Sequence, residues 1–203
     1  MWMNSIATRK TSDNELNIRS ALDCFTFLRG ITSVARFAKP WLPTGKLGPM
    51  LRFGFFGPIL QAKRRRGETI DTPTEANEQL NRLQSLIDLI DDKEKLLLYR
   101  NVVNNLQESF SNYYALSKDN CSLSVVLQWP SLLSDEYINL LMSCDPEALV
   151  IFAHFAVLLS KALPCWWLEG RAEWILASVH SHLEEYYRPW LQWPREELGW
   201  VPE

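Results

Sequence analysis

The most apolar stretch of the chain predicts a central helix that other helices must cover. From Ala148 to Leu159 the only polar side chain is that of His154. Asp145 is a good N-cap, and Pro146 suits the first helical position, where a missing N–H leaves no hydrogen bond unmade. A helix that is apolar on every side is either a membrane span or the centre of a bundle. Because a span needs roughly 20 apolar residues, the pattern predicts a buried central helix over about residues 145–163 and no transmembrane segment.

Helical periodicity continues on the N-terminal side of this stretch. Thr72 and Glu75 form a capping box that predicts the start of a helix. Apolar side chains then recur at three- and four-residue steps over residues 80–90, and again over residues 96–113. Asp91 and its neighbour separate the two runs, so the pattern predicts an antiparallel helical hairpin.

Four further segments complete the expected architecture. Residues 19–39 and 134–144 each predict a helix, and residues 125–127 predict a short extended piece. Residues 166–185 predict an amphipathic helix in which Gly170 leaves a notch for a neighbouring helix or a ligand. With no strand pattern elsewhere, the chain is expected to be all-α, an irregular helical bundle around the central apolar helix.

The domain organisation follows from where this periodicity begins. Residues 1–18 are polar and predict a disordered lead, and residues 19–203 predict a single helical domain. Residues 40–58 contain four prolines and four glycines but also many large apolar side chains. A loop of that composition is expected to lie on the core or to cover an opening in it.

Composition and charge narrow the functional classes. A hydrophobic content of 47% excludes a disordered chain. Residues 1–66 carry twelve Lys/Arg against three Asp/Glu, whereas residues 67–203 carry nine against twenty-one. This asymmetry is typical of nucleic-acid contact or nuclear entry, and is equally what docking of one half on the other would produce. The run Lys63-Arg64-Arg65-Arg66 is a nuclear-localisation candidate, although such runs are also common on solvated surfaces. The expected location is the nucleus or the cytoplasm.

Candidate catalytic chemistry is sparse. The four cysteines form no CxxC pair and the three histidines complete no ligand set, so neither a metal nor another cofactor is expected. The sequence has no Gly-rich phosphate loop, GxSxG or HExxH motif, and an enzyme is not expected. His154 either satisfies a backbone partner, as buried histidines usually do, or orients a ligand in an apolar pocket.

Aromatic residues supply the candidate binding site. Seven of the nine tryptophans lie from Trp129 onward. Arg171 lies between Trp167 and Trp174 in the helical pattern and is expected to stack on a tryptophan. The expected ligand-binding residues lie on the central helix and in the segment that follows it: Phe152, His154, Phe155, Trp166, Trp167, Gly170 and Trp174.

Several short motifs occur in a fixed order along the chain: Phe27–Ile31, Pro40–Pro43, Leu47–Leu51, Trp129-Pro130, Pro146–His154, Trp166–Gly170 and Trp193-Pro194. This ordered set resembles fungal zinc-binuclear-cluster transcription factors, above all the group of the sterol uptake control protein. The resemblance spans about residues 20–199. In that family the region is the C-terminal helical regulatory domain, and in the sterol-responsive members it binds sterol in a hydrophobic pocket and controls transcription.

The chain departs from the family pattern in three ways. The six-cysteine zinc cluster is absent, so no specific DNA binding by the chain itself is expected. The helices that usually precede the first motif are also absent, which implies a domain truncated at its N-terminus relative to the family. Arg171 follows Gly170 where the family often carries another tryptophan.

These features leave three functional hypotheses. The first is a regulatory or ligand-sensing domain that binds a sterol or another apolar small molecule, contacts proteins of the transcription machinery, and is linked to sterol or secondary-metabolite genes. The alternative is a small helical enzyme or accessory protein of a secondary-metabolite pathway, acting on an apolar metabolite. The third is an interaction module that binds a partner through the aromatic tail, residues 190–200.

Overall fold

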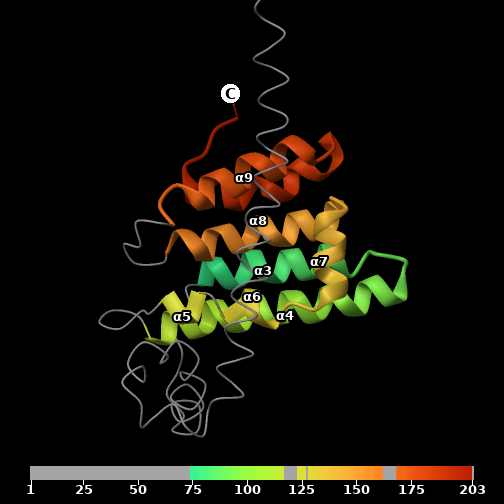
Figure 1. Cartoon of the computed structure of the whole chain (residues 1–203), viewed down its shortest axis with the longest axis horizontal. Helices are drawn as coiled ribbons and strands as arrows, with labels where there is room; N and C mark the ends of the chain where they lie inside the picture. Colours follow the sequence, from blue (N-terminus) through green and yellow to red (C-terminus); the bar gives the residue numbers. More distant parts are fainter. Residues whose placement is uncertain (1–73, 117–122, 127, 162–167, 203) are drawn as a thin grey trace, which may run out of the picture. The chain divides into compact units, whose positions relative to one another are not determined.

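The described part of the chain is helical. The computed structural model describes residues 74–116, 123–126, 128–161 and 168–202, and these ranges contain helices and short connections but no strand (Figure 1). The predicted all-α class is therefore confirmed. The described residues fall into two compact units, one ending at Leu133 and the other beginning at Ser134.

Some predictions concern residues outside the described ranges. These are the disordered lead at 1–18, the helix at 19–39, the apolar loop at 40–58, the capping residue Thr72 and the basic run Lys63–Arg66. The predicted single domain over residues 19–203 extends over several such stretches and stays a prediction.

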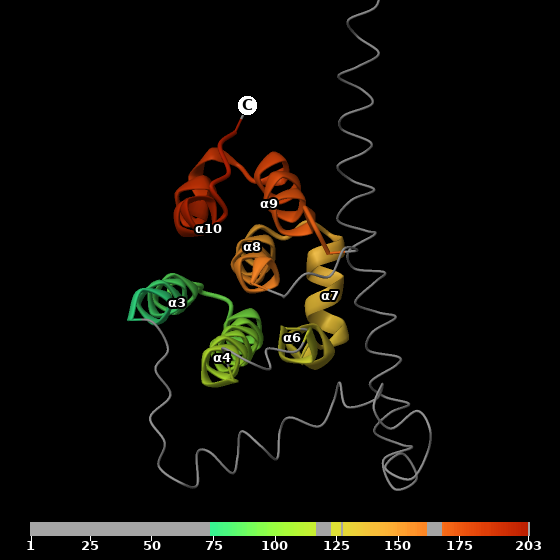
Figure 2. The same cartoon turned by 90° about the vertical axis from the view of Figure 1, so that its left-hand side faces the viewer.

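The unit that begins at Ser134 is organised around one helix. It contains α7 (Asp135–Met142), α8 (Pro146–Ser160), α9 (Arg171–His182), the 3-10 helix η3 (Glu185–Leu191) and α10 (Gln192–Leu198). α8 contacts α7, α9, η3 and α10, and Figure 2 shows α9 and α10 side by side along it. The predicted central helix is thus confirmed, with Asp145 as its N-cap and Pro146 as its first residue.

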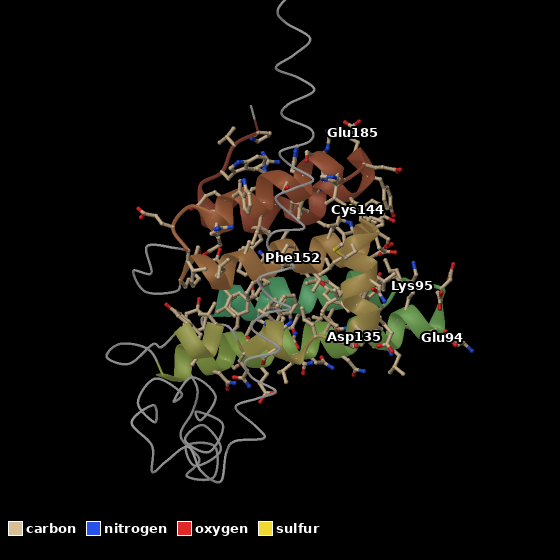
Figure 3. The ribbon with its side chains drawn as sticks, viewed as in Figure 1. Glu94, Lys95, Asp135, Cys144, Phe152 and Glu185 are labelled. Carbon is tan, nitrogen blue, oxygen red and sulfur yellow. The ribbon has the colours of Figure 1, made fainter. Side chains whose placement is uncertain are left out.

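A tight corner joins α7 to α8. The N–H of Cys144 donates to the carbonyl oxygen of Leu141 at 3.1 Å, and that of Asp145 donates to Leu140 at 2.9 Å. This pair of bonds is a Schellman motif, which requires a left-handed residue after the helix. Cys144 takes that position with φ of +56°. Figure 3 shows Asp135 and Cys144 at opposite ends of α7, with Phe152 midway along α8.

The unit that ends at Leu133 contains the predicted hairpin. Its described helices are α3 (Thr74–Ile87), α4 (Lys93–Leu116), α5 (Leu123–Val126) and α6 (Gln128–Leu132). One carboxylate oxygen of Asp92 accepts hydrogen bonds from the N–H groups of Glu94 and Lys95, at 2.9 and 3.2 Å, and so caps α4.

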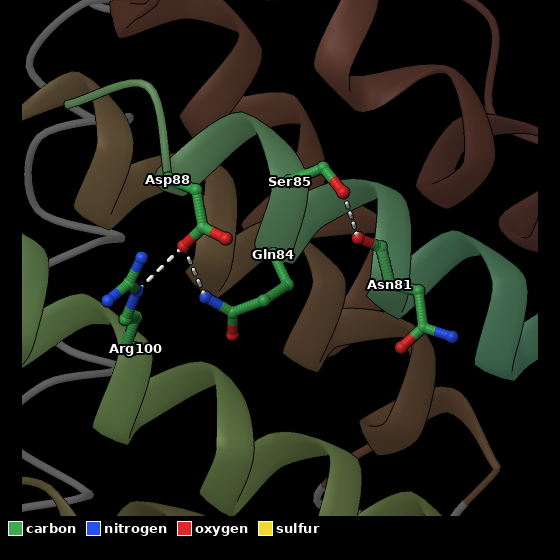
Figure 4. A network of polar contacts seen from close by, with 5 residues as sticks. All are labelled: Asn81, Gln84, Ser85, Asp88 and Arg100. Atoms are coloured by element: carbon green, nitrogen blue, oxygen red, sulfur yellow. Dashed lines mark hydrogen bonds and ion pairs between the residues drawn. The ribbon is translucent and has the colours of Figure 1, made fainter.

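Polar contacts fix the direction of α3 against α4. Near the connection, Arg100 forms an ion pair with Asp88 at 2.7 Å, and Gln84 donates to the same carboxylate (Figure 4). Farther along, Gln107 donates to Asn81 at 3.1 Å. In both pairs, the two partners lie at similar distances along the chain from the connection between the helices. The two helices are therefore antiparallel, as the sequence predicts.

The predicted extended piece at residues 125–127 is wrong at Val125 and Val126, and Leu127 lies outside the described ranges. Residues Leu123–Val126 form a helical turn, α5, that packs on α4 and buries Val125 and Val126. β-branched residues have only a small preference against helix, and burial of both side chains outweighs it. The adjacent α6 is fixed by Trp129, whose Nε1 donates to the carbonyl oxygen of Val102 at 3.0 Å.

Candidate functional site

The candidate site lies along α8, where every residue from Ala148 to Leu159 is buried. The helix ends at Ser160, slightly before the predicted end at about residue 163, and residues 162–167 lie outside the described ranges. Trp166 and Trp167, two members of the predicted ligand-binding set, fall in that gap. The described members of the set are Phe152, His154, Phe155, Gly170 and Trp174.

His154 is a satisfied core histidine. Its Nδ1 lies 2.8 Å from the carbonyl oxygen of Val150, one turn earlier in the same helix. Because a carbonyl can only accept, Nδ1 carries the proton and the neutral ring is the Nδ1–H tautomer. Burial lowers the pKa of His154 to about 4, against the opposing effect of the Val150 hydrogen bond. The ring is therefore neutral at pH 7.

The aromatic members of the set on α8 form a pair of their own. The rings of Phe152 and Phe155 stack with centroids 6.3 Å apart. An α-helix turns about 100° per residue, so His154 points roughly 200° away from Phe152. It instead meets Trp193 of α10, with ring centroids 5.5 Å apart. α8 therefore divides the predicted set, with the phenylalanine pair on one side and the histidine on another.

Trp174 lies on α9 and is half-buried. The guanidinium carbon of Arg171 lies 5.1 Å from the centroid of its indole ring. This confirms the predicted stacking of arginine on tryptophan. Arg171 thus covers one face of Trp174.

Gly170 does not leave a notch inside a helix. α9 begins at Arg171, and Gly170 precedes it as the N-cap with φ of +71°. The residue is exposed, and a Cβ built on it would meet nothing within 4 Å. Glycine is favoured here because the turn requires a left-handed backbone, which the helical periodicity of the flanking residues could not reveal.

Two tyrosines near α8 were not among the predicted site residues. The hydroxyl of Tyr137 donates to the carbonyl oxygen of Ala148 at 2.9 Å, and that of Tyr187 donates to Glu147 at 3.0 Å. Burial, followed by the bond to Glu147, raises the pKa of Tyr187 to about 12. Both hydroxyls are therefore protonated donors at neutral pH. Their hydrogen bonds link α7, through Tyr137, and η3, through Tyr187, to the first turn of α8.

The described ranges contain no cluster of His, Cys, Asp or Glu side chains able to hold a metal ion. Among these same residues no single helix is long and apolar enough to cross a membrane, although α7 and α8, bent by 102°, pass that test as a pair. α8 itself is buried along its apolar length, as the core helix of a bundle is.

Comparisons of the chain with protein-family models, curated proteins and solved structures find no match.

Proposed function

We propose that the chain is a non-catalytic regulatory domain of the kind found in fungal zinc-binuclear-cluster regulators, which acts by binding an apolar small molecule. The ordered motif resemblance supports this proposal, and one observation carries it furthest. The motif Pro146–His154 forms the first part of α8, the buried helix around which its unit is built. A motif at the centre of the core fits a domain in which ligand binding changes the packing of the core. It fits less well a domain in which the motif carries out catalysis.

The described residues that fit an apolar ligand best are Phe152 and Phe155 on α8 and Trp174 on α9. α8 and α9 pack directly against each other. Large aromatic side chains with few polar groups are typical of the lining of small-molecule sites. A sterol or a terpenoid is the class of ligand that this lining and the resemblance favour together.

The enzyme alternative has less support. An active site needs at least two convergent polar groups, and His154 is the polar residue that interrupts α8. Its Nδ1–H is used by Val150, and a pKa of about 4 makes the ring a weak base at neutral pH. His154 therefore serves the core better than it would serve general acid–base catalysis.

A thermal-shift experiment with a panel of sterols and terpenoids tests this function. A ligand that binds only the folded state stabilises it by about 2.7 kcal/mol at a hundred times its Kd, so at least one compound should raise the melting temperature saturably. A panel in which no apolar compound raises it would sink the ligand-binding proposal.

The same proposal includes location in the nucleus and action through protein partners. A fusion to a fluorescent protein too large to diffuse through nuclear pores should accumulate in nuclei. Replacing Lys63, Arg64, Arg65 and Arg66 by alanine should remove that accumulation, because the basic run is the recognised charge cluster. Unchanged nuclear accumulation in the alanine variant would show that this run is not the signal.

A further inference from the structure

A group of cationic and aromatic side chains lies at the end of the chain, away from the proposed apolar site. His180 is on α9, Arg188 on η3, and Arg195 on α10, with Trp200 just beyond. α10 packs against α9 (Figure 2) and against η3. The three basic side chains therefore come from α10 and from the two elements that it contacts.

Trp200 contacts both Arg195 and His180. The N–H of Trp200 donates to the carbonyl oxygen of Arg195 at 3.0 Å, across a turn in which Gly199 has φ of +59°. The turn folds the indole back, and its ring centroid lies 5.2 Å from that of His180 in an edge-to-face contact. Trp200 thus bonds to the backbone of Arg195 and packs its ring against that of His180.

Neither Arg188 nor Arg195 forms an ion pair with a carboxylate of the described residues. The Nε of Arg195 is buried and has no hydrogen-bond partner in the part of the chain that the structure describes. Buried donors are nearly always hydrogen-bonded, and each exception calls for an explanation.

The electrostatic effect on His180 agrees with this geometry. Partial burial lowers the pKa of the imidazole, and the guanidinium groups of Arg188 and Arg195 lower it further. Two cationic groups thus act on one half-buried imidazole. Residues 67–203 as a whole carry more acidic than basic side chains, so this local excess of positive charge is unusual for that part of the chain.

We propose that His180, Arg188 and Arg195 form a binding site for a phosphate group, either free phosphate or a phosphate monoester. Guanidinium groups present planar forks of N–H donors that match phosphate oxygens. A bound phosphate accepts from the guanidinium N–H groups of Arg188 and Arg195, offsets both guanidinium charges and stabilises the protonated form of His180. The Trp200 ring borders the site and gives the organic part of an ester a surface on which to rest. The site does not depend on the apolar-ligand proposal.

Titration of the full chain with inorganic phosphate, at constant ionic strength, tests the site. The melting temperature should rise saturably, and NMR of the three histidines should show that phosphate raises the pKa of His180. A rise of equal size in sodium chloride of the same ionic strength would mean general screening and would overturn the site.

Two arginine variants and a matched control make the test specific. Arg188 is exposed, so R188Q should keep the fold, and it should weaken phosphate binding about tenfold, as expected for one charge-assisted hydrogen bond. R195Q should weaken it at least as much, whereas R82Q removes an exposed arginine of α3 and should bind as the wild type does. Wild-type affinity in R188Q and R195Q, or equal loss in R82Q, would contradict the proposal.

Phenyl phosphate separates the two sources of the phosphate group. Tighter binding of the ester than of inorganic phosphate, lost in R188Q, would identify a phosphorylated molecule that rests on Trp200. Equal affinities, both lost in R188Q, would identify free phosphate. Binding of neither compound would overturn the site.

Discussion

At the scale of single residues, environment decides what a side chain does. His154 is the one polar interruption of α8, yet its hydrogen bond to Val150 and its burial make it a neutral part of the core. Cys144 has an ordinary side chain, yet its backbone takes the left-handed conformation that the corner after α7 demands. At each of these two residues the environment lowers the stability of the fold under some condition, and a substitution can measure that effect.

The cost at His154 should appear as a loss of stability in acid. Its folded pKa, about 4, lies below the ordinary value of 6.5. As pH falls from 6.5 to 4, the unfolded chain therefore takes up a proton that the folded chain refuses, and the free energy of unfolding falls. This residue should account for a loss of about 3 kcal/mol. Urea unfolding at pH 7 and pH 4 should show a smaller loss for His154→Gln, and parallel pH profiles for the two proteins would contradict the assignment.

The cost at Cys144 should be recoverable with glycine. A non-glycine residue in the left-handed region is less stable than glycine by about 1 kcal/mol, so Cys144→Gly should raise the free energy of unfolding by about that amount. Ser143→Gly is the control, because Ser143 has φ of −84° and gains nothing from glycine. Urea unfolding of both variants distinguishes them, and a loss of stability in Cys144→Gly would show that its side chain outweighs the backbone strain.

At the scale of the elements, hydrophobic periodicity predicted the helices whose positions are determined by the burial of apolar side chains. The apolar run at 148–159, the two runs of the hairpin and the break at Asp91–Asp92 all correspond to observed features. Periodicity failed where local backbone geometry or long-range packing decided the outcome. Packing on α4 made residues 123–126 helical, and the left-handed turn at Gly170 delayed the start of α9.

The candidate site was harder to predict than the fold for a related reason. The sequence identified aromatic residues on α8 but not which of them share a face with residues from other helices. His154 was grouped with Phe152 and Phe155, whereas its ring neighbour is Trp193, far away in sequence. Such a pairing depends on how α10 returns to α8, and composition carries no signal for it.

The start of α4 offers a test at this scale. Asp92 accepts two backbone N–H groups, whereas the neighbouring Asp91, which is equally exposed, makes no side-chain hydrogen bond to a described residue. Asp92→Ala should lower the free energy of unfolding by about 1 kcal/mol, the usual loss of an N-cap. Asp91→Ala removes the same charge without the cap and should change stability by only a few tenths. Equal losses in the two variants, measured by chemical denaturation, would show that charge rather than capping matters here.

At the scale of the whole molecule, the buried apolar helix α8 is the feature that a proposed function must account for. The side chains of α8 from Ala148 to Leu159 are buried, and its aromatic rings pack against other side chains. A protein built in this way can respond to a ligand through changes in core packing. The phosphate site proposed at the end of the chain adds a second, polar point of contact that is chemically independent of α8.

The most direct test of the central claim is binding of a naturally fluorescent sterol, followed by energy transfer from tryptophan. We expect saturable transfer in the wild-type chain, because Trp174 lies on the helix that packs against α8. Phe155→Leu, which keeps an apolar side chain while removing the aromatic ring, should weaken the binding. Phe110→Leu in α4, at a buried phenylalanine outside the proposed lining, is the matched control and should bind as the wild type does. Absence of saturable transfer, or equal weakening in both variants, would contradict a sterol site at α8.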